Sequence, residues 1–310
     1  MKPPYKNLGR NHAPTAMELW RLMRTPKPKW SFRSSTQSFE SPPTRVEGAN
    51  LRVTFINHMT FLIQTQGKNL LTDPIWAQRC SPSQWVGPQR FAPPGLPLES
   101  LPPIDAILIS HDHYDHLCLP TLKRISSAHD PEVFTGKGVG RTVRKSGLKT
   151  VHELEWWERA EWFDNGFIQA CPAQHFSGRT PFDRNRTLWL SFWIQTPDVR
   201  LYFAGDTGMG PHFGLIHERL GAPDVSLLPI GAYKPLWFMS PVHMSPEEAI
   251  ESHDILHSKE SIATHFGTFA LAMDGQDEPE QVLLEKKADR KFHTLKHGEW
   301  LQWPAPPVPE

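Results

Sequence analysis

The side chains of this chain that could do chemistry are concentrated in one short stretch, His111-Asp112-His113-Tyr114-Asp115-His116. The stretch follows the apolar run 106–109 directly, so a strand that ends there would bring imidazoles and carboxylates to one point at a sheet edge. Such ligands suit zinc, iron or manganese, and two histidines with an acid are typical of an open, catalytic metal site. The alternative is a solvated, histidine-rich turn. Other parts of the chain argue against it, because they supply further ligands in the same setting.

Three more potential ligands follow strand-like runs elsewhere in the chain. They are His175 after residues 167–172, Asp206 after 201–205 and His265 after 261–264. Sites in layered α/β folds form at the carboxyl ends of the strands. A single histidine after a strand is more often packed or solvent-facing, but four strands that all end in ligands predict one shared site.

The spacing HxHxDH, followed by single His, Asp and His residues, resembles that of the metallo-β-lactamase fold hydrolases with two metals. Shorter blocks are similar to the N-acylphosphatidylethanolamine-hydrolysing phospholipase D family. These blocks are Leu-Thr-Asp-Pro at 71–74, Gly-Ala-Tyr at 231–233, Trp-Phe-Met at 237–239 and Gly-Thr-Phe-Ala-Leu-Ala at 267–272. The fold that this resemblance implies is a four-layer αββα sandwich of the α/β (α+β) class. Hydrophobic periodicity alone indicates only a mixed α/β protein.

The resemblance also implies two metals per chain, expected to be zinc with iron or manganese as alternatives. The first metal is assigned to His111, His113 and His175, the second to Asp115, His116 and His265, and Asp206 bridges both. A carboxylate can bridge two cations because it has two oxygens. Two metals about 3.5–4 Å apart can share a water and lower its pKa. Asp115 is also predicted to be catalytic, by orienting the metal-bound hydroxide and accepting its proton.

Two residues are expected beside the ligands. Asp73, in Thr-Asp-Pro, is predicted to accept a hydrogen bond from a ligand imidazole and so fix its tautomer; capping of its own turn is the alternative. His58 stands in Asn-His-Met-Thr, where the family usually has Gly-His-Ala-Thr, and how this loop packs beneath the metals is left open. His297 is predicted to be structural.

Substrate contacts are predicted on one side of the metals. His243 precedes a helix that Ser245 and Pro246 should start, and the free N–H groups at such a helix end suit a phosphate. Val242 stands where the family commonly has Gln, so head-group preference should differ. Apolar contacts are predicted from Trp237, Phe238, Met239 and Phe269. Burial in a large sandwich core is the alternative for these aromatic residues, and a surface position near a helix cap is the alternative for His243.

The function that follows from these expectations is hydrolysis of a phosphodiester by a metal-bound hydroxide. By resemblance the substrate is a glycerophospholipid of the N-acylphosphatidylethanolamine type, cleaved as by a phospholipase D. A lactonase-like enzyme or another phosphoesterase for small soluble anions would use the same site. A non-catalytic metal-binding regulator is a third hypothesis, and the intact set of seven ligands argues against it.

Composition agrees with an intracellular enzyme. The formal net charge is zero, so no global basic surface for nucleic acid is expected. Three cysteines at unrelated spacings argue against a disulfide framework and fit a reducing compartment. The sequence shows neither a signal peptide nor an apolar run of the ~18 residues that a membrane span needs. A cytoplasmic location is predicted, with peripheral membrane contact and a homodimer left open.

The predicted organisation is a basic arm or linker, residues 1–48, before a hydrolase domain, residues 49–310. Residues 1–45 hold nine Lys or Arg against two Glu, a balance of +7. Residues 17–24 are predicted to form a short amphipathic helix. This helix either binds the surface of an anionic membrane or belongs to an arm that packs on the domain. Deletion of residues 1–33 is expected to spare the metal site. Helices are further predicted at 120–126, 139–146, 246–256 and 278–290, and residues 74–103 are expected to form a wall or lid.

Overall fold

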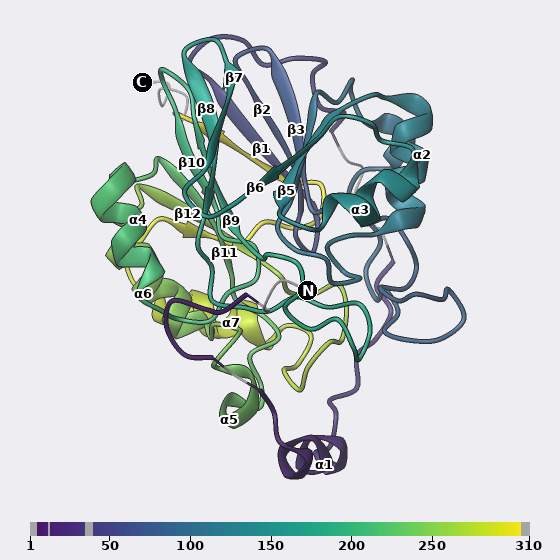
Figure 1. Ribbon diagram of the computed structural model, residues 1–310. Coiled ribbons are helices and arrows are strands. Elements are labelled where there is room, and N and C mark those ends of the chain that lie inside the picture. The colour runs from purple at the N-terminus through teal and green to yellow at the C-terminus, as the bar shows by residue number, and fades with distance from the viewer. Residues whose placement is uncertain (1–4, 12, 35–39, 305–310) are drawn as a thin grey trace.

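Two mixed sheets stand back to back in the computed structural model, which describes residues 5–11, 13–34 and 40–304 (Figure 1). Each sheet has seven strands. The first sheet runs in the order β14 (Trp300–Trp303), β1 (Leu51–Asn57), β2 (Thr60–Thr65), β3 (Lys68–Thr72), β4 (Ala106–Ile109), β5 (Glu132–Gly136) and β6 (Val151–Leu154). The second runs β13 (Phe292–His293), β12 (Glu260–Thr264), β11 (Val225–Pro229), β10 (Arg200–Phe203), β9 (Ser191–Gln195), β8 (Gly166–Cys171) and β7 (Arg159–Phe163).

Alternating side chains divide the apolar core into three layers. Phe61 and Ile63 of β2 point into the core between the sheets, whereas Leu62 points to the outer face of the first sheet, as the two-residue period of a strand requires. That outer face is covered by α2 (Leu119–Ala128) and α3 (Gly140–Val143). The outer face of the second sheet is covered by α4 (His212–Leu220), α6 (Pro246–Leu256) and α7 (Glu278–Lys286). The fold is therefore the predicted four-layer αββα sandwich.

The helices follow the predicted positions with local differences. The helix at 246–256 has the predicted bounds, because Ser245 and Glu248 form the expected capping box. The predicted helix at 139–146 is divided into α3 and a 3-10 turn, Arg144–Ser146. The helix predicted to reach residue 290 ends at Lys286. Arg290 instead folds back onto the Asp254 carboxylate of α6, 2.7 Å away.

The N-terminal segment lies on the domain and carries one helix, α1 (Ala16–Arg24), which stands beside α5 (Leu236–Met239) at the bottom of Figure 1. Thr15 and Glu18 cap α1 in a capping box, and none of its residues is buried. Beyond α1 the chain is fixed again, since the Trp30 indole donates to the Asp274 carbonyl and Phe32 stacks on Phe91. No helix among the described residues is both long and apolar enough to cross a bilayer.

Candidate metal centre

The carboxyl ends of four strands meet at one edge of the sandwich and bring all seven predicted ligands together. Strands β4, β8, β10 and β12 precede them, as the sequence predicted. The side chains form overlapping groups whose ligand atoms lie within 4.8 Å of one another: His111 with His113 and His175; His111 with His116 and Asp206; Asp115 with His116, His265 and His58; and His175 with Asp206 and His243. The backbone makes this convergence tight. Gly205, with φ +59°, lies so close to Ser110 that an added Cβ would be 2.7 Å from the Ser110 Cβ.

One half of the cluster consists of three imidazoles, from His111, His113 and His175. The Nδ1 atom of His113 lies 2.8 Å from His111 Nε2 and 3.3 Å from His175 Nε2. Donors around a tetrahedral zinc lie about 3.3 Å apart, so this spacing fits a shared cation. Burial lowers the pKa of all three rings, and the neighbouring histidines lower those of His111 and His175 further. We refer to these three residues as the imidazole half; its rings are neutral and their lone pairs are free for a metal.

The other half, which we call the carboxylate half, consists of Asp115, His116, Asp206 and His265. His116 Nε2 lies 3.1 Å from an oxygen of each aspartate, and His265 Nε2 lies 3.2 Å from Asp206 Oδ1. Burial opposes charge on all four groups, but mutual attraction overrides it. The two carboxylates raise the pKa of His116 well above its usual value and that of His265 to about 9. In return the histidines hold the pKa of both aspartates well below the usual range.

The residues fit a metal because their inward-facing atoms lack other partners. Within the described part of the chain, the buried atoms His116 Nε2, His265 Nε2 and Asp206 Oδ1 make no hydrogen bond of good geometry and face only other groups of the cluster, at 3.1–3.2 Å. Buried polar atoms whose hydrogen bonding is incomplete are costly, and a cation between them would satisfy all three. The cluster is therefore able to bind metal.

The outer nitrogens of the cluster are held by the surrounding chain. His175 donates Nδ1–H to the Val242 carbonyl, 2.8 Å away, which turns its Nε2 inward. Asp73 lies where it was expected and accepts from His116 Nδ1 at 2.7 Å. The same carboxylate also accepts from the backbone N–H and the hydroxyl of Ser110. Asp73 thus fixes both ends of the HxHxDH turn.

Two residues around the cluster were not identified as partners from the sequence. Asn7 donates to the His175 carbonyl at 2.9 Å and accepts from the His175 N–H at 3.1 Å. His58 contacts Asp115 and His265. The unusual Asn-His-Met-Thr sequence was a signal for His58, but no pattern in the sequence marks Asn7. Deletion of residues 1–33, which was expected to spare the site, would also remove Asn7 and its two hydrogen bonds to the His175 backbone.

Two of the three predicted substrate residues on α5, Phe238 and Met239, border a hollow beside the cluster. Its volume is about 340 Å³, and α1 covers part of it. The hollow is lined by Pro14, Leu19, Leu22, Phe176, Arg184, Phe238, Met239, Val242 and His243. The Trp237 ring faces the Arg21 guanidinium of α1 at 4.3 Å. The buried Nδ1 atom of His243 has no hydrogen-bond partner among the described residues. The centroid of the His243 ring lies 5.0 Å from that of the His175 ring.

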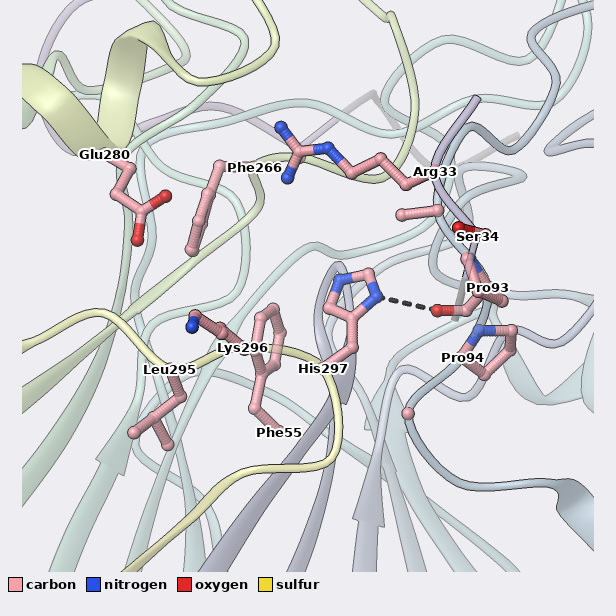
Figure 2. A pocket seen from close by; sticks show the side chains of 13 residues that line it. Arg33, Ser34, Phe55, Pro93, Pro94, Phe266, Glu280, Leu295, Lys296 and His297 are labelled. Atoms are coloured by element: carbon pink, nitrogen blue, oxygen red, sulfur yellow. Dashed lines mark hydrogen bonds between the residues drawn. The ribbon is translucent and has the colours of Figure 1, made fainter. Parts of the chain in front are cut away.

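Phe269 and His297 lie elsewhere. Phe269 is buried with Ile75 and Cys118, and its ring meets the His58 ring edge-on at 5.3 Å. It therefore packs behind the cluster rather than along the hollow. His297 borders a second hollow of about 200 Å³, where it donates Nδ1–H to the Pro93 carbonyl at 2.8 Å and faces Phe55 (Figure 2). Its other nitrogen is 3.2 Å from the Thr268 hydroxyl, which agrees with the predicted structural role.

Comparison with known proteins agrees with this architecture. Residues 68–266 match the family model for the beta-lactamase superfamily domain. The chain is 36% identical to N-acyl-phosphatidylethanolamine-hydrolyzing phospholipase D 1 of Caenorhabditis elegans over 81% of this chain and 75% of that protein. It is 41% identical to an uncharacterized protein of Mycobacterium tuberculosis over 77% of this chain and 65% of that protein. A solved metallo hydrolase from Ignicoccus hospitalis superposes with a TM-score of 0.63 at 21% identity, covering 83% of this chain and all of that one.

The fold and the His/Asp cluster therefore define a metal-dependent hydrolase of the metallo-β-lactamase superfamily. Within that superfamily the chain belongs to the same family as the Caenorhabditis elegans phospholipase D.

Proposed function

We propose that the protein is a two-metal phosphodiesterase of the phospholipase D type that hydrolyses N-acylphosphatidylethanolamine-like lipids, with zinc as the metal. The observation that carries the proposal is the convergence of seven ligand side chains beside an apolar hollow. Two relatives support the substrate class, since the names of the Caenorhabditis elegans protein and of a mitochondrial protein of Saccharomyces cerevisiae both describe this hydrolysis. The yeast protein is 34% identical, and the chain spans 47% of its length.

In this proposal His111, His113 and His175 would hold one metal, Asp115, His116 and His265 would hold the other, and Asp206 would be shared by both. When bound, the two metals would activate a water and neutralise the charge that develops on the phosphoryl group. Asp115 is 9% exposed, the most accessible of the four groups in the carboxylate half. Its carboxylate can therefore orient the attacking water and take its proton.

The hollow under α1 is lined mainly by apolar side chains, which suit the acyl chain of a lipid. Leu19 and Leu22 of α1 face Phe238 and Met239 of α5 across it, while His243 lies at the end near the cluster. A phosphodiester placed at the metals would therefore lie next to His243, and its acyl chain next to apolar side chains. Val242 lines the hollow at the position where the family commonly has Gln, so one polar head-group contact is absent.

Several exposed apolar side chains support docking on a membrane surface. On α1, Met17 and Met23 are more than 70% exposed, and Trp20 is about half exposed. Trp85 and Phe182, both nearly 90% exposed, belong to two loops that line a common hollow. Amphipathic helices and aromatic side chains of this kind insert at the water–lipid boundary. We propose peripheral contact of a cytoplasmic protein with anionic lipid, aided by the positive balance of residues 1–45.

The proposal is tested with zinc-loaded protein and vesicles of N-acylphosphatidylethanolamine in water enriched in ¹⁸O. Hydrolysis of the distal P–O bond adds water to phosphorus, so the phosphatidic acid should carry the label and the N-acylethanolamine should leave with its own oxygen. Mass spectrometry measures both products. Release of a fatty acid, or label in the N-acylethanolamine, would contradict a phospholipase D reaction. Turnover of a small soluble phosphodiester or lactone with no lipid cleavage would favour the soluble-substrate enzyme instead.

A further inference from the structure

We propose that His58, which lies outside the seven ligands, is a positioning residue that holds Asp115 and His265 of the carboxylate half in place. This inference rests on the proposed function, because it gives a role to one more residue beside the same metals. It concerns a single histidine that approaches the cluster from the first sheet, between β1 and β2.

His58 reaches Asp115 through its ring. Its Nε2 lies 3.0 Å from Asp115 Oδ2, and the side chain is almost completely buried. Because a carboxylate oxygen can only accept, the ring donates its Nε2–H across this distance. Donation of Nε2–H to Asp115 leaves the remaining lone pairs of that carboxylate free, so Asp115 can bind a cation and accept from His58 together. The hydrogen bond fixes the orientation of the carboxylate plane.

His58 reaches His265 through its backbone and its ring face. The His265 N–H donates to the His58 carbonyl at 3.0 Å, and the two ring centroids are 4.2 Å apart. The His58 N–H in turn donates to the Thr268 hydroxyl, three residues beyond His265. His265 itself has φ +62°, an uncommon conformation for a residue with a side chain. The contacts with His58 therefore support the strained turn that presents His265 to the cluster.

The neighbours of His58 explain how the loop is held beneath the cluster. His58 and Met59 connect the two strands of a hairpin, and His58 has φ +48°. On one side Asn57 accepts from the buried Arg90 guanidinium at 3.0 Å and donates to the Ile75 carbonyl. On the other side Met59 is buried in the core between the sheets. The two residues that differ from the family pattern thus anchor the loop from both sides.

The test measures the affinity of metal-free protein for zinc by competition with a chelator, which needs no turnover. His58→Leu removes the donor, and His58→Gln supplies an amide N–H at a similar reach. Partners of metal ligands contribute about 10–100-fold to metal affinity. We expect His58→Leu to weaken one of two zinc equivalents by that factor and His58→Gln to restore most of it. Turnover should fall in kcat more than in KM, because the hollow under α1 is untouched.

His297→Leu is the matched control. His297 is also an inward-facing histidine, and it hydrogen-bonds the same Thr268 hydroxyl, but it contacts none of the cluster residues among those described. The substitution His297→Leu should lower the melting temperature and leave the affinities for both zinc ions unchanged. If His58→Leu fails to fold, His58→Gln and His58→Met give the same comparison, since the two side chains are similar in length and only the amide donates.

Three outcomes would overturn the inference. Unchanged affinity for both zinc equivalents in His58→Leu would show that the residue is not needed at the cluster. Equal losses of zinc affinity in His58→Leu and His58→Gln, or in His58→Met and His58→Gln, would exclude a role for the N–H donor. Wild-type protein that binds fewer than two zinc ions would contradict the proposed two-metal site itself, and that failure is recognised without any variant.

Discussion

The two halves of the cluster are prepared for a cation in different ways. In the imidazole half burial and mutual repulsion keep His111 and His175 neutral, so their nitrogens are ready to bind metal. In the carboxylate half Asp115 and Asp206 raise the pKa of His116 and His265, so protons take the place that a metal would occupy. The first half can bind a metal without losing protons, whereas the second must release them. The difference arises from where the chain places its two acidic groups.

Replacing Asp206 should have the largest effect, because this carboxylate is proposed to bridge the two metals. Asp206→Ala removes the oxygens proposed to bridge the metals and leaves His116 and His265 with one carboxylate between them. Partners outside the ligand set contribute up to about 100-fold, so loss of a ligand should weaken zinc binding and turnover by more than that. Elemental analysis and lipid turnover measure the two effects. A variant that retains two zinc ions would remove Asp206 from the bridging position.

Asp115→Asn should separate metal binding from chemistry within the carboxylate half. The amide keeps an oxygen for the metal but cannot accept a proton, so turnover should fall by at least ~10²-fold while much of the zinc is retained. Asp112→Asn is the matched control from the same motif. The Asp112 carboxylate accepts from Gly178 and Thr187 rather than from the cluster. Near-normal turnover of Asp115→Asn would exclude Asp115 from proton handling.

The metal-free protein should lose stability as the pH rises, because of the carboxylate half. The folded pKa of His265 is raised to about 9, so its stabilising contribution is complete below the unfolded value near 6.5 and is lost through pH 9. The melting temperature with a chelator should therefore fall between pH 6.5 and pH 9.5, and His265→Asn should flatten that fall. Zinc-loaded protein should change little over the same interval. If the melting temperature fell equally steeply with pH in the wild type and in His265→Asn, the assignment of the titrating proton to His265 would be wrong.

Changes on the exposed side of α1 should have the smallest effect and should spare both halves alike. Trp20→Ser with Met23→Ser removes apolar side chains that face solvent and keeps Asn7 in place. Binding to anionic vesicles should weaken, and it should weaken further as the salt concentration rises to physiological ionic strength, where the screening length is about 8 Å. Zinc content and turnover of a short-chain, water-soluble phosphodiester should stay unchanged. Leu284→Ser, on the exposed face of α7, is the control, and unchanged vesicle binding by the α1 variant would end the docking proposal.

The parts of the site that could be predicted from the sequence are those positioned by residues nearby in the chain. Each of the seven ligands comes shortly after the end of a short apolar strand, and Ser245 with Glu248 marks the start of α6. The contacts of Asn7 and His58 could not be predicted, because neither residue belongs to the predicted ligand set. Asn7 lies 168 residues from His175, and His58 lies 57 residues from Asp115. Only the packing of the N-terminal segment and the first hairpin against the cluster brings these pairs together, and no spacing rule encodes that packing.

Calorimetric titration of metal-free protein with zinc, in buffers of different ionisation enthalpy near pH 7.5, tests the difference between the halves most directly. We expect two equivalents of zinc, one that releases few protons and one that releases about two, from His116 and His265. Asp115→Asn should reduce the proton release of the second equivalent and leave the first unchanged. A single equivalent, or two that release protons equally, would contradict the division of the cluster into an imidazole half and a carboxylate half.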